Sequence, residues 1–390
     1  MPFIEIYVWL PITRIAMIAL VVENENQVDD MLKAVDAAGA SEVKWISVSP
    51  FATERLEQLG IKSYMVDIFM PEKMCSQISE KVSFNYVIGV AEIEDSKLGC
   101  EHDLKPFSYW IYELFMVRSH LDYIYSAYKM IDKTLKPEQI WAHTSKNYLA
   151  DDSSTITFDP REARWGRIFE ADVRYKPEVK AEVKLLPEVP YPVKVKKKNS
   201  NKERMASVAN VFTKMFRKKK SVLVVKPYAE WRYCYAEFMR KGCGVYFFDP
   251  ASVKGEKFER NFTINDVDSD MWYGRVFWIA DWYYKRCLPI YLEAKRKIEK
   301  LEPIAVLTST KNPETFPVCK AARDLGVPVV TFQHGSAGYY RHKTVAYSDM
   351  WESDYYFTFG QKVADIYKGV AVRTGVKVVP VGMPSLDCYG

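Results

Sequence analysis

Short apolar runs alternate with amphipathic helical patterns along most of this chain, and this alternation is the strongest constraint on its fold. Residues 15–22, IAMIALVV, form an uninterrupted apolar run, as expected for a strand that is covered on both faces of a sheet. The next stretch spaces Val28, Met31 and Val35 along one face of a helix. Strands that alternate with helices in this way predict a parallel sheet with helices on its faces.

The same alternation returns in the second half of the chain, where SVLVV, GVYFFDP, IAVLTST, VPVVTFQ, DYYFTFG and VKVVPVG read as strands. Residues 148–219 lack it and are instead rich in charge and proline, which indicates irregular structure followed by a solvated basic connector. We therefore predict an α/β protein with Rossmann-like, doubly wound parallel sheets. Its parts are an N-terminal α/β region at 1–147, an irregular, basic connector at 148–219 and a Rossmann-like domain at 220–390.

Three further elements are predicted from local pattern. A single long aromatic helix is expected over about 106–137, a strand over 62–70, and a long helix over roughly 273–301.

Composition narrows the class of protein. The chain has 390 residues, enough for two or three domains of about 150 residues each. Its 55 basic and 50 acidic side chains are too balanced to indicate a nucleic-acid partner. The seven cysteines form no CxxC pair, which is typical of reduced cytosolic thiols. Glu5, Pro11 and Arg14 interrupt the apolar stretch at the start of the chain, so this stretch does not have the pattern of a signal peptide. We therefore expect a cytoplasmic protein.

The stretch VPVVTFQHGSAG carries the main candidate for chemistry. A predicted strand runs into Gln333 and His334, and in open parallel sheets ligands bind beyond the carboxyl ends of the strands. Gly335 would let the backbone approach a ligand, and Ser336 would add a hydroxyl. A neutral histidine in this place suits a general base or a phosphate partner. The alternative is a histidine that caps its own strand through a backbone carbonyl.

Polar residues also follow two other predicted strands. Thr310, Lys311 and Asn312 follow the strand before His334, so they would line the same crevice. His143 ends a strand in the first half as His334 does in the second, and a place in the same cleft is one hypothesis for it.

The segments SDYYFTFGQ (353–361) and VVPVGMPSLD (378–387) follow in order. Together with Gln-His-Gly, this series resembles the GT-B glycosyltransferase superfamily. The likeness is greatest to surface and capsular polysaccharide enzymes and to the CDP-glycerol glycerophosphotransferase family. It covers roughly residues 301–387. The chain departs from the family pattern with Ser336 where threonine follows His-Gly, and with Ser385-Leu386 where Arg-Asn is common.

The resemblance implies transfer of a sugar or glycerophosphate from a nucleotide donor to a surface polysaccharide or lipid-linked acceptor. It implies His334 as general base or as the residue that steadies the acceptor or phosphate. Neither a metal nor another cofactor is expected, since helix N-termini and basic side chains can stabilise a leaving diphosphate. The implied substrate-binding residues are Gln333, Gly335, Ser336, Thr310, Lys311, Asn312, Gly382 and Pro384.

In such enzymes the Gly-x-Pro-x-x-Asp segment lies near the end of the first domain. The resemblance therefore implies that this chain lacks the C-terminal donor domain and is a truncated, acceptor-side part. Two alternatives remain, a nucleotide-sugar epimerase of the same fold and a non-catalytic binding or scaffold fragment. The basic run at 194–220 is either a solvated connector or a peripheral contact with anionic lipid at the inner membrane face.

Overall fold

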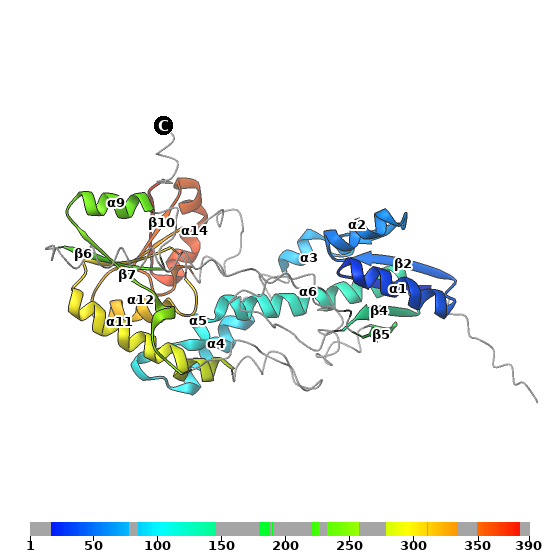
Figure 1. Cartoon of the computed structure of the whole chain (residues 1–390), viewed down its shortest axis with the longest axis horizontal. Coiled ribbons are helices and arrows are strands. Elements are labelled where there is room, and N and C mark those ends of the chain that lie inside the picture. Colours follow the sequence, from blue (N-terminus) through cyan, green and yellow to red (C-terminus); the bar gives the residue numbers. More distant parts are fainter. Residues whose placement is uncertain are drawn as a thin grey trace, which may run out of the picture.

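The protein is described by a computed structural model that covers residues 17–77, 85–144, 179–187, 189, 220–226, 232–256, 278–309, 311–333 and 349–382. Two parallel sheets with helices on their faces make up the fold, which confirms the predicted α/β class and is compatible with a Rossmann-like arrangement. In Figure 1 the two sheets lie at opposite ends of the molecule, with the long helix α6 running between them.

The first sheet has five strands in the order β3-β2-β1-β4-β5. All of its neighbours pair in parallel, and the chain changes direction between β1 and β4. This is the strand order typical of dinucleotide-binding Rossmann folds. The strands are β1 (Met17–Val22), β2 (Glu42–Ser47), β3 (Ser63–Met65), β4 (Gln139–His143) and β5 (Glu182–Leu186).

Helices cover both faces of this sheet. Alternate residues of β1 divide between two cores because successive side chains of a strand point to opposite faces. Ile18 and Leu20 pack with one helical layer, and Ala19 and Val21 pack with the other. The first layer holds α1 (Glu25–Ala38) and α2 (Pro50–Gln58), and the second holds the short helices η1 (Val66–Ile68) and α3 (Glu72–Gln77) and part of α6 (Ile111–Leu135).

The second sheet has six parallel strands in the order β11-β10-β9-β8-β6-β7. The chain starts in the interior at β6, adds β7 on one side and then crosses to β8 on the other. The switch point of this sheet therefore lies between β6 and β8. The strands are β6 (Ser221–Val225), β7 (Gly244–Phe248), β8 (Ala305–Thr308), β9 (Val329–Phe332), β10 (Tyr355–Thr358) and β11 (Lys377–Pro380).

The second sheet is also covered on both faces. Val222 and Val224 of β6 pack on the side of α9, whereas Leu223 and Val225 pack on the side of α11 and α12. Both sets of side chains are almost fully buried. The helices of this half are α9 (Arg232–Arg240), η6 (Pro250–Ser252), the π-helical η7 (Tyr283–Cys287), α11 (Leu288–Leu301), α12 (Phe316–Asp324) and α14 (Gln361–Thr374).

One segment from the first half of the chain belongs to the core of the second sheet. This segment holds α4 (Asn85–Leu98), η3 (Glu101–Asp103), α5 (Pro106–Tyr109) and the start of α6. Val87, Phe107 and Phe115 share one hydrophobic cluster with β6, β8 and β9. The other end of α6, around Tyr128, packs on the first sheet instead. Helix α6 is therefore part of both cores, and the predicted boundary at residue 147 stays a prediction.

Several elements differ from those predicted. The helix expected over 106–137 is divided at Trp110, whose indole packs edge-on against Trp278 and Trp282 at 4.4 and 5.4 Å. The strand expected over 62–70 ends at Met65, because the chain then turns to bury Phe69 and Met70 beneath α6. The helix expected over 273–301 contains a π-helical turn.

Strand β5 lies inside the region that was predicted to be an irregular connector. It pairs in parallel with β4 along its whole length. Apart from Lys220, the basic run at 194–220 lies outside the described residues, so its two interpretations stay open. Among the helices that the structure describes, none combines the length and the apolar character that crossing a membrane requires.

Candidate functional site

The carboxyl ends of β6 and β8 form the switch point of the six-stranded sheet, which is where open α/β sheets bind ligands. Lys226 directly follows β6 and has a left-handed backbone, with φ at 48°. Glu314 stands in the turn after β8, just before α12. Arg286 comes from the π-helical turn η7, on the helix that connects the β7 loop to β8. Three separate segments of the chain therefore converge on this edge.

These three side chains form one charged cluster. The Lys226 amine lies 3.5 Å from one carboxylate oxygen of Glu314, and the Arg286 guanidinium lies 3.6 Å from the other. The side chains of Glu314 and Arg286 are only 10% and 14% exposed, while that of Lys226 is 30% exposed. Two cations share one carboxylate, so these three described side chains together carry one positive charge in excess. An excess positive charge that is half-shielded from water suits an anionic group such as phosphate.

The π-helical turn has a local cause. Pro289 has no backbone N–H, so the carbonyl of Lys285 receives no helical hydrogen bond from it. The backbone loop at Gly255 packs against this carbonyl instead. A Cβ atom at Gly255 would lie 2.6 Å from the Lys285 oxygen, so only glycine fits without movement. Turns of this kind are frequent at functional sites.

Arg286 also fixes the loop that follows β7. Its guanidinium donates hydrogen bonds to the carbonyl oxygens of Val253 at 2.8 Å and Pro250 at 3.1 Å. Much of the donor capacity of Arg286 is therefore used to hold the loop. Lys226 is the more exposed of the two cations and is the better placed to meet an incoming ligand.

The predicted site residue Gln333 lies at this sheet edge but bonds within the protein. Its backbone N–H donates to the carbonyl of Phe357 at 2.8 Å, and its side-chain oxygen accepts from the N–H of Phe359 at 2.9 Å. The side chain is 2% exposed. It extends the pairing of β9 with β10 by one residue and holds the start of the segment that leads to His334.

Lys311 was predicted to line the crevice, and its side chain is directed into the protein. The buried amine donates to the carbonyl of Trp351 and to the hydroxyl of Ser353, and it lies 5.7 Å from the centre of the Phe316 ring. Burial lowers the pKa of Lys311 below its ordinary value. These contacts join the end of β8 to the segment before β10.

Asn312 closes a compact turn before α12. Its N–H donates to the Thr315 hydroxyl at 2.9 Å, and its side-chain oxygen accepts from the Thr315 N–H at 3.1 Å. Gly382 follows β11 in a left-handed conformation, with φ at 80°, which glycine adopts readily. The other predicted site residues, Thr310, His334, Gly335, Ser336 and Pro384, lie outside the described residues, and their roles stay predictions.

Lys226, Arg286 and Glu314 are not among the residues predicted from the sequence, whereas Ser309 lies within the strand end at Thr308–Thr310 that was expected to line the crevice. Ser309 follows β8 and is fully buried, and its hydroxyl has no hydrogen-bond partner in the described part of the chain. A lysine or serine directly after a predicted strand is a weak indication of a ligand-binding residue, and it can be recognised in the sequence. The pairing of Arg286 with Glu314 cannot, because only the fold brings the two together.

His143, the other strand-end histidine, ends β4 in the five-stranded sheet and is completely buried. Its Nδ1 atom lies 2.6 Å from the carbonyl of Pro187, and its Nε2 atom lies 3.5 Å from the carboxylate of Asp30. Burial lowers the pKa of His143 below its ordinary value. His143 therefore belongs to the five-stranded sheet, whereas the strand that precedes His334 in the sequence, β9, belongs to the six-stranded sheet.

No family model matches the chain, and no curated protein matches it. The fold and the charged cluster are therefore the basis of the functional inference that follows.

Proposed function

We propose that this protein binds a nucleotide-activated donor and transfers its sugar or glycerophosphate group to a polysaccharide or lipid-linked acceptor, in the manner of GT-B glycosyltransferases. The observation that carries the proposal is the cluster of Lys226, Glu314 and Arg286 at the switch point of a Rossmann-like sheet. A diphosphate is the anionic part that all such donors share, and the excess positive charge at this edge suits it.

The order of strands supports the same proposal. His334 comes two residues after the end of β9 in the sequence, and β9 is the neighbour of β8, so the proposal assigns His334 to the same carboxyl edge as Lys226 and Ser309. In this proposal His334 takes the proton from the acceptor hydroxyl, and the cations stabilise the negative charge that develops on the leaving group, which is a nucleoside diphosphate in sugar transfer and CMP in glycerophosphate transfer. The protein would act on the cytoplasmic side of the cell envelope, where the basic 194–220 segment contacts anionic lipid.

A non-catalytic binding protein is the second candidate. One observation favours it, because the side chains of Gln333, Lys311 and Asn312 all bond within the protein. In that case the edge would bind a nucleotide but perform no transfer.

Binding of CDP and UDP, measured by calorimetry, tests the first step. We expect Lys226→Met to weaken binding about tenfold, the effect of losing one charged hydrogen bond. Lys300→Met is the matched control, since Lys300 is exposed in the last turn of α11 and precedes the amino end of β8. Equal loss in both variants, or no binding by the wild type, would refute the proposed donor site.

Turnover separates the two candidates. The transferase requires that the wild-type protein releases CMP from CDP-glycerol, or UDP from a UDP-sugar, in the presence of an acceptor, and that His334→Ala abolishes this release while nucleotide binding persists. Nucleotide binding without turnover supports the binding protein. Unchanged turnover in His334→Ala would remove His334 from the mechanism.

A further inference from the structure

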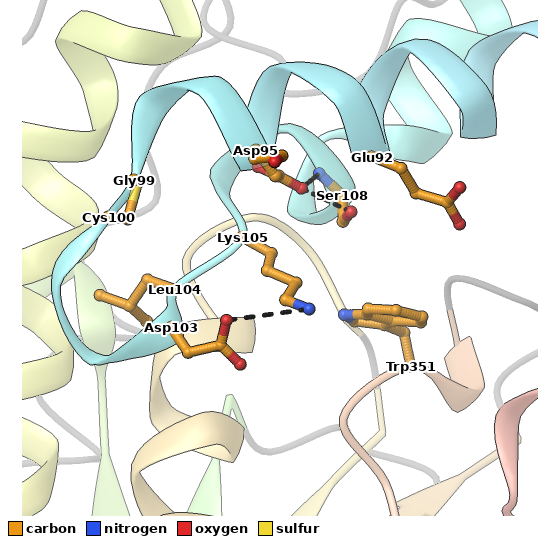
Figure 2. A pocket seen from close by; sticks show the side chains of 10 residues that line it. Glu92, Asp95, Gly99, Cys100, Asp103, Leu104, Lys105, Ser108 and Trp351 are labelled. Atoms are coloured by element: carbon orange, nitrogen blue, oxygen red, sulfur yellow. Dashed lines mark hydrogen bonds and ion pairs between the residues drawn. The ribbon is translucent and has the colours of Figure 1, made fainter.

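A second feature of the molecule lies between helices α4 and α5 and the segment before β10. There the side chains line a cavity of about 490 Å³ that is open to solvent, and its volume is within the range of roughly 300 to 1,000 Å³ that is usual for small-molecule sites. Figure 2 shows α4 above the cavity, the η3 turn on one side and the Trp351 indole on the other. The cavity contains none of the residues of the Lys226 cluster.

The cavity has a polar lining with one large ring. Three carboxylates from Glu92, Asp95 and Asp103 face one ammonium from Lys105, and Trp351 supplies the ring. The described residues of the lining therefore have a formal charge of −2, the sum of three acids and one base. The Lys105 amine lies 3.9 Å from the Asp103 carboxylate and points toward the indole of Trp351.

The walls of the cavity are held in place from outside it. Asp95 is buried, and its carboxylate accepts hydrogen bonds from the N–H groups of Phe107 and Ser108 at 2.8 and 3.0 Å and from the Ser108 hydroxyl at 2.7 Å. These three bonds leave the carboxylate about one of its four acceptor positions. The carbonyl of Trp351 accepts a hydrogen bond from the Lys311 amine, which fixes the opposite wall.

The turn that carries Asp103 is strained. His102 and Asp103 are consecutive non-glycine residues with left-handed backbones, at φ values of 59° and 53°. Strain of this kind persists only where surrounding contacts impose it. Here the Tyr283 hydroxyl accepts from the N–H of Glu101 at 2.9 Å, and the His102 ring stacks on Tyr291 at 4.7 Å. This backbone conformation costs stability, and it places the Asp103 carboxylate beside the Lys105 amine.

The charges of the lining exclude two classes of ligand. Among the described lining residues an anion would meet three carboxylates and one cation, so its binding is opposed. A cationic amine would have to occupy the space between the carboxylates and the indole, where the Lys105 ammonium already lies. A neutral ligand rich in hydroxyl groups avoids both conflicts, because hydroxyls donate to carboxylates and accept from an ammonium.

We propose that this cavity binds a neutral saccharide unit, with the Trp351 indole against an apolar face of the sugar and with Glu92, Asp103 and Lys105 as hydrogen-bond partners of its hydroxyls. The proposal goes beyond group transfer at the β6–β8 edge and holds for a transferase and for a binding protein alike. It adds a sugar site that is separate from the nucleotide site.

Saturation-transfer NMR with glucose, galactose, N-acetylglucosamine and maltose tests the proposal on the full chain. We expect at least one of these sugars to bind, and inorganic phosphate and putrescine not to displace it. Lys105→Met should weaken sugar binding about tenfold through the loss of a charged hydrogen bond. Lys97→Met is the control, because Lys97 is exposed on α4, pairs with Glu94 and lies outside the cavity lining.

Asp103→Asn is the second variant, and because this side chain is 77% exposed we expect the variant to stay folded. It should also weaken sugar binding and leave CDP and UDP binding unchanged, which separates this site from the nucleotide site. The proposal is overturned if none of the four sugars binds, if Lys97→Met loses as much affinity as Lys105→Met, or if putrescine displaces the sugar.

Discussion

The two parallel sheets share an architecture and differ in the chemistry of their switch points. At the five-stranded sheet, β1 is followed by the acidic and amide sequence of Glu23, Asn24 and Glu25. At the six-stranded sheet, β6 is followed by Lys226, and Arg286 is brought to the same edge. The strand order alone makes both edges candidate ligand sites. Their side chains favour an anion only at the second.

The edge of the five-stranded sheet is closed by its own hydrogen bonds. The Asn24 side chain accepts from the N–H of Gln27 at 3.0 Å and caps α1, and the Gln27 side chain accepts from the N–H of Glu23 at 2.8 Å. The Ser49 hydroxyl donates to the Glu23 carbonyl at 2.5 Å. Acidic residues thus occupy the helix N-terminus, where a phosphate would otherwise be stabilised. The two sheets share a fold, so any difference in function between them depends on the residues in the loops at their carboxyl edges.

The largest expected difference between the two halves is in their response to pH. Burial raises the pKa of Asp95, in the core of the six-stranded half, to about 6 from an ordinary value of 3.8. The folded state then holds the proton more tightly than the unfolded state, so stability falls as pH rises from about 4 to 6. We expect Asp95→Asn, which does not titrate, to gain about 3 kcal/mol relative to the wild type between pH 4 and pH 7.

Urea unfolding of both proteins at each pH measures this gain. The variant also loses a hydrogen bond at every pH, so the trend with pH is the test and the absolute difference is not. A constant difference between the variant and the wild type would show that Asp95 titrates normally.

His143 should show the opposite trend in the five-stranded half. Its pKa is lowered by burial, so the unfolded state takes up the proton first as pH falls through the ordinary value of 6.5. Stability is therefore lost on acidification. We expect His143→Gln to gain stability relative to the wild type between pH 7 and pH 5, measured in the same urea series. A parallel pH trend in the two proteins would contradict the neutral, buried state of His143.

Gly255→Ala should have the next largest effect, and it is confined to the six-stranded half. The added methyl group would meet the Lys285 carbonyl at 2.6 Å, so the loop or the π-helical turn must move. We expect a loss of about 2 kcal/mol in the free energy of unfolding. Nucleotide binding should fall as well, because the same movement displaces Arg286.

Gly89→Ala is the matched control for that prediction. Gly89 lies inside α4, and nothing is within 4 Å of the position of its added Cβ. Alanine should stabilise this helix by about 0.5 kcal/mol. A result in which both variants lose equal stability would mean that the approach of Gly255 to Lys285 is not what limits this position.

The fold was predictable where burial on both faces made a strand continuously apolar, as in β1 and β6. Strand β5 was missed because EVKLL at the edge of its sheet alternates exposed and half-buried residues among charges. The π-helical turn was missed because a helical pattern runs through it, and Pro289 alone does not say how the freed Lys285 carbonyl is accommodated, which depends on the approach of Gly255 from a distant part of the sequence.

For the candidate site, the sequence predicted where along the strands some residues lie, but not the contacts of their side chains. Gln333, Lys311 and Asn312 lie at the carboxyl edge, as their place after a strand predicted. The spacing along a strand says where a residue lies but not where its side chain goes. The Lys311 amine reaches Ser353, 42 residues further along the chain. The cluster of Arg286 with Glu314 depends on the same kind of tertiary contact, which no local pattern encodes.

The smallest expected effects come from one pair of matched substitutions, Ser49→Ala and Ser309→Ala, at the two edges. Ser49 caps α2 by accepting from the N–H of Ala52 at 3.2 Å, so its loss should reduce stability by about 1 kcal/mol. The buried Ser309 hydroxyl has no hydrogen-bond partner among the residues described, so its loss should change stability by less than about 0.5 kcal/mol.

Ligand binding should follow the reverse order. Ser309 directly follows β8 at the proposed nucleotide site, so Ser309→Ala should weaken CDP or UDP binding, whereas Ser49→Ala should not. Calorimetry with both nucleotides, alongside urea unfolding, measures the two properties on the same proteins. If Ser49→Ala lowers stability without changing binding, and Ser309→Ala weakens binding without changing stability, the first edge has a structural role and the second binds the nucleotide. If Ser309→Ala leaves binding intact and destabilises the protein, Ser309 has a structural role like that of Ser49, and the proposed nucleotide site does not include it.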